Sequence, residues 1–229
     1  MRLQIFILLA IQICLCSSFL PSSFNHASGV ERWLTKKASV KVYGGESSDI
    51  PKGERDEIAQ TLFQTVASMG QIGSKLSQTD QDQILALAES LKPYSDPEPA
   101  KISLAGTHEL LYSASAGGSS GALGPFVGKV TQHFLNNEDF INKVSFGSNL
   151  FSIELEAKRK VLDESRIRVT FLNTKASLIG KEVLNKETKG AGVWSYLFSG
   201  VVTIDGEATL LRVILTPSLF IIRQKIDAN

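Results

Sequence analysis

The sequence has very little sulfur and very little histidine. Of its 229 residues only two are cysteines, Cys14 and Cys16, and only three are histidines. If processing removes the segment that carries both cysteines, the mature chain has no disulfide, no sulfur nucleophile and no thiolate metal ligand. Only His108 and His133 remain in the body of the chain, which disfavours a histidine-based zinc or iron site. We therefore expect no metal and no other cofactor.

A strong net charge is also absent, since the formal charge at pH 7 is +1. That balance gives no general attraction to nucleic acid. The aromatic residues are mainly phenylalanine, which disfavours the base-stacking surfaces of single-strand binding proteins. A local basic cluster is interleaved with acids and is predicted to form a solvated hairpin. Its members are Lys158, Arg159, Lys160, Arg166 and Arg168.

One stretch resembles a catalytic motif, because GGSSG at 117–121 matches the G-x-S-x-G nucleophile elbow of serine hydrolases. An elbow needs a strand, a sharp turn and then a helix, whereas here Pro125 precedes a strand-like segment. The order Ser, acid, His also fails, because residues 120–132 contain no acid before His133. We interpret GGSSG as a loop and assign no catalytic residue to it, Ser119 included.

The N-terminal part is almost free of acids and has the features of a targeting sequence. Arg2 precedes a short apolar run that suits a signal peptide over residues 1–18. The following transit-like segment, 19–50, is rich in serine and basic residues. With Phe19 at the junction, this order is similar to the two-part plastid address of diatoms and related algae. It predicts entry into a secondary plastid through the secretory pathway, with simple secretion as the alternative.

Residues 54–92 are predicted to form two amphipathic helices. Apolar residues recur at three- or four-residue spacing between Ile58 and Met69, and Gly70 can take the left-handed position after a helix. A second helix is predicted to begin at Thr79 in a capping-box-like pattern. The proline-rich KPYSDPEP then ends it, because proline cannot continue a helix.

Beyond Pro99 the apolar period changes from about four to two, which predicts β-strands. Asp205–Gly206 between two such runs predicts a two-residue hairpin. Many short antiparallel strands indicate a closed barrel or a sandwich, so the domain at 54–227 is expected to be α+β, with its barrel at 102–225. The predicted strands are 104–115, 126–135, 139–147, 149–158, 165–173, 176–184, 192–204, 208–215 and 219–225.

Aromatic side chains on these strands are the candidate site residues. They either fill the interior, as side chains do in small barrels, or line a cavity for an apolar ligand, as in lipocalins. Alternation does not separate the two readings. The candidates are Tyr112, Phe126, Phe134, Phe146, Phe151, Phe171, Trp194 and Phe198.

The order of these elements resembles that of plastid lipid-associated proteins, also called fibrillins. LAGTHELLYSAS at 104–115 is similar to their opening strand L-x-G-x-W-x-L-x-Y-T-S, with His108 at the tryptophan position. GKVTQHF at 128–134 is similar to their G-x-V-x-Q strand. LTPSLFIIR at 215–223 departs from their L-D-D-D-L-R-I-x-R ending, with TPS in place of the acids and Phe220 in place of the arginine.

The resemblance implies a helix pair packed on a lipocalin-like barrel in a plastid protein. It also implies non-enzymatic binding or organisation of carotenoids, prenylquinones or other lipids, at the surface of plastoglobules or thylakoids. Two alternatives stay open. A coat protein would have a filled barrel and no ligand. A barrel enzyme acting on a plastid isoprenoid or lipid would need acid-base chemistry from Glu109, Asp139, Glu154 or Asp205.

Overall fold

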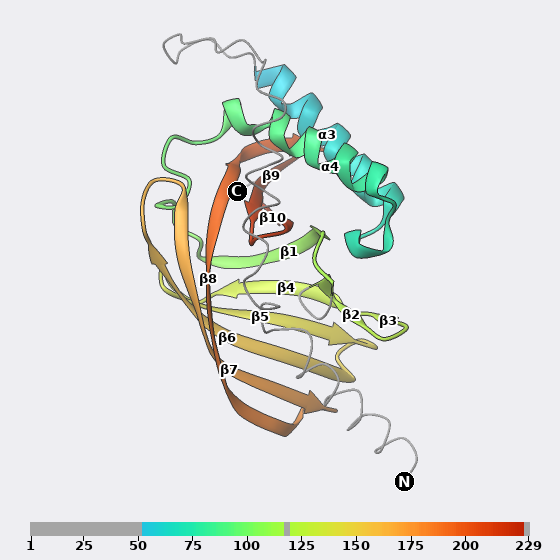
Figure 1. The fold of residues 1–229 in the computed structure, drawn as a ribbon, viewed down its shortest axis with the longest axis vertical. Helices are drawn as coiled ribbons and strands as arrows, with labels where there is room; N and C mark the ends of the chain where they lie inside the picture. Colours follow the sequence, from blue (N-terminus) through green and yellow to red (C-terminus); the bar gives the residue numbers. More distant parts are fainter. Residues whose placement is uncertain (1–51, 117–119, 227–229) are drawn as a thin grey trace.

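The computed structural model describes residues 52–116 and 120–226 (Figure 1). The expected targeting segments, 1–18 and 19–50, lie outside the described residues, and so does Ser119. Within the described part the helices come first and the strands follow, as the change of period predicts. Neither helix there has the length and hydropathy needed to span a bilayer.

The two helices have well-defined ends. α3 (Lys52–Met69) stops where Gly70 has a φ of 104°, a left-handed conformation that glycine adopts readily. α4 (Gln78–Ser90) starts after Ser77, whose Oγ accepts a hydrogen bond from the backbone N–H of Asp80 at 3.2 Å. The cap is therefore Ser77, and the start predicted at Thr79 was too late.

The strands form two sheets, and the larger one closes on itself. Its members are β1 (Gly106–Ser113), β4 (Lys129–Phe134), β5 (Asp139–Phe146), β6 (Phe151–Val161), β7 (Arg166–Leu178), β8 (Lys181–Ile204), β9 (Glu207–Leu215) and β10 (Leu219–Lys225). They pair antiparallel in the order β1-β10-β9-β8-β7-β6-β5-β4, and β4 pairs back to β1. β2 (Ala122–Leu123) and β3 (Phe126–Val127) form a separate small hairpin. The predicted α+β fold with a lipocalin-like barrel is thus confirmed.

Of two turns in the sheet, the sequence predicts one and does not predict the other. Asp205 and Gly206 have φ values of 51° and 79° and join β8 to β9, as predicted. Residues 176–184, by contrast, do not form a strand of their own. They contain the end of β7, a turn at Ile179 and Gly180, and the start of β8. The period-two pattern runs through that turn, so it does not mark where the chain reverses.

A β-bulge in β1 moves its side chains from one face of the sheet to the other. Leu110 pairs with Ile222 of β10 and Tyr112 pairs with Ile221, which leaves Leu111 as an extra residue. Leu110 and Ile222 belong to the cluster inside the barrel, whereas Tyr112 and Ile221 belong to the cluster beneath the helices.

β8 contains a second bulge with the same effect. Tyr196 pairs with Ile214 inside the barrel, whereas Phe198 pairs with Val213 on the outer face, with Leu197 as the extra residue. Both bulges lie on the side of the barrel that α3 and α4 cover (Figure 1).

The helix pair packs on this outer face and forms a second core. On β10, Arg223 lies with its Cζ 4.9 Å from the ring centroid of Phe63 on α3, which adds a cation–π contact at the edge. Gln60 on α3 and Asp205 hydrogen-bond to each other at the β8–β9 turn. The buried members of the second core are Ala59, Leu62, Val66, Ile84, Ala88, Leu91, Tyr112, Phe198, Val202, Ile204, Leu211, Val213, Leu219 and Ile221.

Replacing Phe198 with alanine should destabilise the protein by about 3–5 kcal/mol, because the side chain is fully buried between sheet and helices. Chemical denaturation followed by circular dichroism measures the change. The matched control is Phe126→Ala on the small hairpin, where the ring is 65% exposed and a much smaller change is expected. Equal losses in the two variants would contradict the packing described here.

Candidate binding site inside the barrel

Aromatic rings form a continuous chain inside the barrel. The ring of His108 meets Phe134 edge-on, with centroids 5.2 Å apart and planes at 86°. Phe134 stacks on Phe140 at 5.1 Å. Phe140 contacts Trp194 at 5.8 Å, and Trp194 contacts Phe220 at 6.2 Å. The rings come from five strands, β1, β4, β5, β8 and β10, so they join opposite walls of the barrel.

Five of the candidate aromatic residues lie in the barrel. Phe134 and Trp194 are buried members of the interior cluster, and Phe146 and Phe171 pack against it partly buried. Phe151 packs against a small separate cluster around Ile153 and Ala176.

The other three candidates do not line the interior. Tyr112 and Phe198 face the helices, because the bulges at Leu111 and Leu197 reverse the alternation on which the expectation rested. Phe126 is exposed on the small hairpin, because β3 is not a barrel strand.

A row of polar side chains crosses the interior on three neighbouring strands. His108 of β1 pairs with Gln132 of β4, and Gln132 pairs with Asn142 of β5. His108 and Gln132 are completely buried. Among the described residues, His108 Nδ1, Gln132 Nε2, Gln132 Oε1 and Asn142 Oδ1 have no hydrogen-bond partner. Buried polar atoms are normally paired, so these four are sites where a bound molecule or water fits.

His108 is held neutral and in one tautomer. Its Nε2 lies 3.2 Å from the carbonyl oxygen of Leu104, which can only accept, so Nε2 carries the proton and Nδ1 is an acceptor. Burial lowers the pKa of His108 to about 4, and the charge of Arg212 acts in the same direction. At neutral pH the row therefore offers acceptors at His108 and Asn142, and both a donor and an acceptor at Gln132.

Two arginines are buried in the same interior. Arg212 of β9 is fully buried and alternates with Ile214 on the inward face. Its Nη2 donates to the carbonyl of Ser103 at 3.2 Å, whereas Nε and Nη1 have no partner among the described residues. Arg159 of β6 is 5% exposed and donates from Nε to the carbonyl of Asn137 at 2.6 Å, whereas its Nη1 is unpartnered. Within the described chain neither guanidinium forms an ion pair.

The charge environment of Arg212 is unfavourable for a cation. Burial lowers the pKa of Arg212, and the charge of Arg159 acts in the same direction, whereas Tyr196 and Asp96 act against both. Asp96 is half-buried beside it. Burial raises the pKa of Asp96, and the positive charges of Arg212 and Arg55 oppose that shift.

The linker at 95–105 closes the end of the barrel where Arg212 and Asp96 lie. We name this end of the barrel the linker end. Ala100 and Leu104 are fully or almost fully buried in the interior cluster. The backbone N–H of Asp96 donates to Ser199, and that of Ala100 donates to Glu164. The linker thus lies across β8 and the β6–β7 turn (Figure 1).

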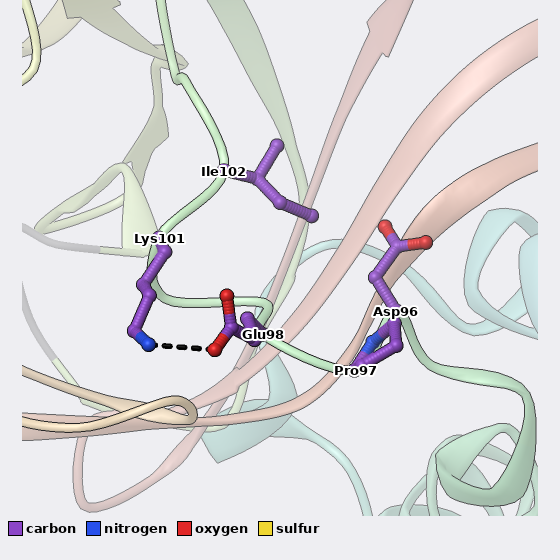
Figure 2. Close-up of a pocket in the computed structure, with 5 residues that line it drawn as sticks. All are labelled: Asp96, Pro97, Glu98, Lys101 and Ile102. Atoms are coloured by element: carbon purple, nitrogen blue, oxygen red, sulfur yellow. Dashed lines mark hydrogen bonds and ion pairs between the residues drawn. The ribbon is translucent and has the colours of Figure 1, made fainter.

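An open depression with a volume of about 540 Å³ lies on the linker, and Figure 2 shows the residues that line it. The 2.6 Å ion pair between Lys101 and Glu98 borders one side of the depression, and Asp96 borders the other side. Ile102 is a further lining residue. Pro97 also lines it. Asp96 thus borders this depression and also acts on the charge of the buried Arg212.

The carboxylates considered for acid-base chemistry do not enter the interior. All four lie on the outer surface and interact with neighbouring side chains there. Glu109 pairs with Lys129, Asp139 with Lys158, Glu154 with Lys143, and Asp205 bonds to Gln60. Within the described residues no three potential ligands gather in a way that would hold a metal ion.

The arginines were missed by sequence reasoning. Arg159 was expected on a solvated hairpin, and of that basic cluster it alone is buried, because it shares the inward face of β6 with Leu155 and Ala157. Arg212 lies within TLLRVIL, where both alternating faces are apolar. An arginine in such a run was the available signal, since a strand with no polar face is buried on both sides.

The fold and the interior define a class of protein, the helix-covered lipocalin-like barrel. The PAP_fibrillin family model matches residues 56–214, more than half of the chain. The chain therefore belongs to the plastid lipid-associated protein (fibrillin) family, and this family implies association with plastids. No curated protein and no solved structure matches the chain.

Acidification should weaken folding through His108. Its pKa is about 4 in the folded chain and about 6.5 when unfolded, so between these values only the unfolded state binds the proton. The stability this histidine contributes is complete above pH 6.5 and falls as pH decreases, by about 2 kcal/mol between pH 7 and pH 5. Denaturation curves at both pH values measure it.

The comparison variant is His108→Gln, which keeps a donor for Leu104 and does not titrate. Its stability should change less between pH 7 and pH 5 than that of the wild type. An identical change in both proteins would show that other groups cause the acid sensitivity.

Proposed function

We propose that this protein is a non-enzymatic lipid-binding protein that holds an apolar lipid of the plastid, such as a carotenoid or a prenylquinone, inside its barrel. The observation that carries the proposal is the row of unpartnered polar atoms on His108, Gln132 and Asn142 within an aromatic interior. Rings supply contact area for a long apolar molecule, and the polar row supplies partners for its carbonyl or hydroxyl group. The linker closes the site to water.

The membership of the family and the targeting pattern support a place inside a plastid. We propose entry into a secondary plastid through the secretory pathway, with residues 1–18 and 19–50 as successive signals, and residence at thylakoids or plastoglobules.

The opposite end of the barrel offers a surface for lipid contact. We name it the hairpin end; it consists of the β2–β3 hairpin and the turns at 147–150 and 178–181. The two turns are adjacent, since the N–H of Ile179 donates to the carbonyl of Leu150 at 2.7 Å. Ile179 is 71% exposed and Leu150 is 55% exposed, and Phe126 and Val127 of the hairpin are exposed as well.

Charge favours this end over the linker end. The turns and hairpin tip carry no acid, and Lys181 is their one charged residue. The turns of the linker end also expose leucines, but they contain Glu138, Asp163 and Glu164, which an anionic lipid surface repels. Apolar side chains at loop tips, free of acids, suit insertion at a lipid–water boundary.

Lipid in the barrel should change the fluorescence of Trp194, because this ring lies in the aromatic chain. Titrating the full chain with a prenylquinone and with a carotenoid should give saturable quenching at about one ligand per chain. Trp33→Phe should retain the signal and Trp194→Phe should lose it. A signal that does not saturate, or that survives Trp194→Phe, would favour a coat protein with a filled barrel.

Leu150→Asp combined with Ile179→Asp should reduce binding to vesicles of phosphatidylcholine and phosphatidylglycerol by at least about tenfold, because charges then replace the inserting side chains. Flotation in a density gradient measures the bound fraction. The matched control is Leu135→Asp combined with Leu162→Asp, which adds the same two charges at exposed leucines of the linker end. If this control variant reduces flotation as much, the hairpin end is not the lipid-facing surface.

A further inference from the structure

The barrel interior holds more positive charge than it neutralises. Arg212 and Arg159 are both buried, and each has at least one guanidinium nitrogen without a partner. Tyr196 and Asp96 favour the charge of Arg212, and Asp96 is half-buried at the linker and accepts no hydrogen bond from Nε or Nη1. One carboxylate therefore acts on Arg212, and no ion pair neutralises either buried arginine in the described part of the chain.

Such an arrangement is unfavourable unless something completes it. Burying a cation without a counter-ion is strongly unfavourable, and burying two near each other adds repulsion. Other arginines of the same β6–β7 hairpin are exposed, because Arg166 and Arg168 lie on the outward face of β7. The chain instead places Arg159 inward, on the same face as Ala157.

The geometry points to an anion-binding site: we propose that the unpartnered guanidinium nitrogens of Arg212 and Arg159 bind the anionic head of an amphipathic lipid whose chain lies along the rings of the barrel. The inference rests on the lipid-binding function proposed above and changes the class of its ligand, because carotenoids and prenylquinones carry no anionic group. A carboxylate or a phosphate monoester fits, because each offers several acceptor oxygens to guanidinium donors.

The surroundings of the arginines agree with a lipid rather than a free ion. Phe134 and Trp194 belong to the same interior cluster as Ile214, the neighbour of Arg212 on the inward face. The linker covers the guanidinium, with Ser103 as the partner of Nη2. An anion there would be shielded from water, and its attached chain would replace water along the rings.

Paired ligands test the head group without any mutation. Oleate and oleyl alcohol share a chain, as do farnesyl phosphate and farnesol, and Trp194 fluorescence follows all four. We expect oleate or farnesyl phosphate to bind at least about tenfold more tightly than its alcohol, since only the anion engages the guanidinium nitrogens. The stronger of the two pairs identifies the carboxylate or the phosphate as the preferred anion.

Substitutions then show which residues cause the preference for the anion over the alcohol. Arg212→Met should remove the preference for the anion and leave binding of the alcohol, while the melting temperature of the free protein stays the same or rises. Arg168→Gln, which removes an exposed arginine from β7, should keep the preference. A fall in the melting temperature of Arg212→Met with the preference intact would overturn the site and give Arg212 a structural role. Arg159→Gln on β6 provides a second test and should also weaken the preference for the anion.

The outcomes separate this inference from the function on which it rests. Equal binding of anion and alcohol in the wild type overturns the anion site and leaves a lipid-binding barrel. Binding of none of the four, together with no response to a prenylquinone or a carotenoid, overturns both.

Discussion

Two bulges, at Leu111 and Leu197, determine which side chains enter the barrel and which hold the helices. Each inserts one residue and so transfers the rest of its strand to the opposite face. Without them Tyr112 and Phe198 would point inward beside Leu110 and Tyr196. With them, the same strand supplies the interior at one end and the helix-covered core at the other. The packing of the helix pair, the second core and the set of side chains inside the barrel all depend on this reversal.

The interior combines close packing with incomplete hydrogen bonding, and the two features have different consequences. The rings from His108 to Phe220 contact one another across the barrel and stabilise it by apolar burial. The polar atoms of Gln132, Arg212 and Arg159 lack partners and so reduce stability in the free state. Apolar side chains at these positions would make the free domain more stable. These are the groups with which the polar end of the proposed ligand would pair.

Much of the fold follows from the sequence because it is encoded locally. Gly70 ends a helix and Asp205–Gly206 turns a hairpin through conformations that few neighbours influence. The bulges are different, because nothing in the local pattern around Leu111 or Leu197 distinguishes an extra residue from a regular one. That is why Phe134 and Trp194 were placed in the interior correctly by alternation, whereas Tyr112 and Phe198 lie on the other face.

The polar part of the site was harder to predict for a related reason. A charged residue in a strand is usually solvated, and Arg159 looked no different from Lys158 and Lys160 on either side. Only closure of the sheet decides which of them points inward. Gln132 and His108, 24 positions apart along the chain, are paired by the register of β1 and β4. Such a pair is a property of the closed barrel rather than of either strand.

The backbone conformation of Ile179 bears on the lipid contact proposed for the hairpin end. A β-branched residue with a φ of 51° is strained by about 1–3 kcal/mol, and glycine would relieve that strain. The turn keeps isoleucine nonetheless, with its side chain in solvent. Folding in water gains nothing from this choice. The lipid contact proposed for the hairpin end gives a reason for an exposed isoleucine here, at a stability below that of a glycine at the same position.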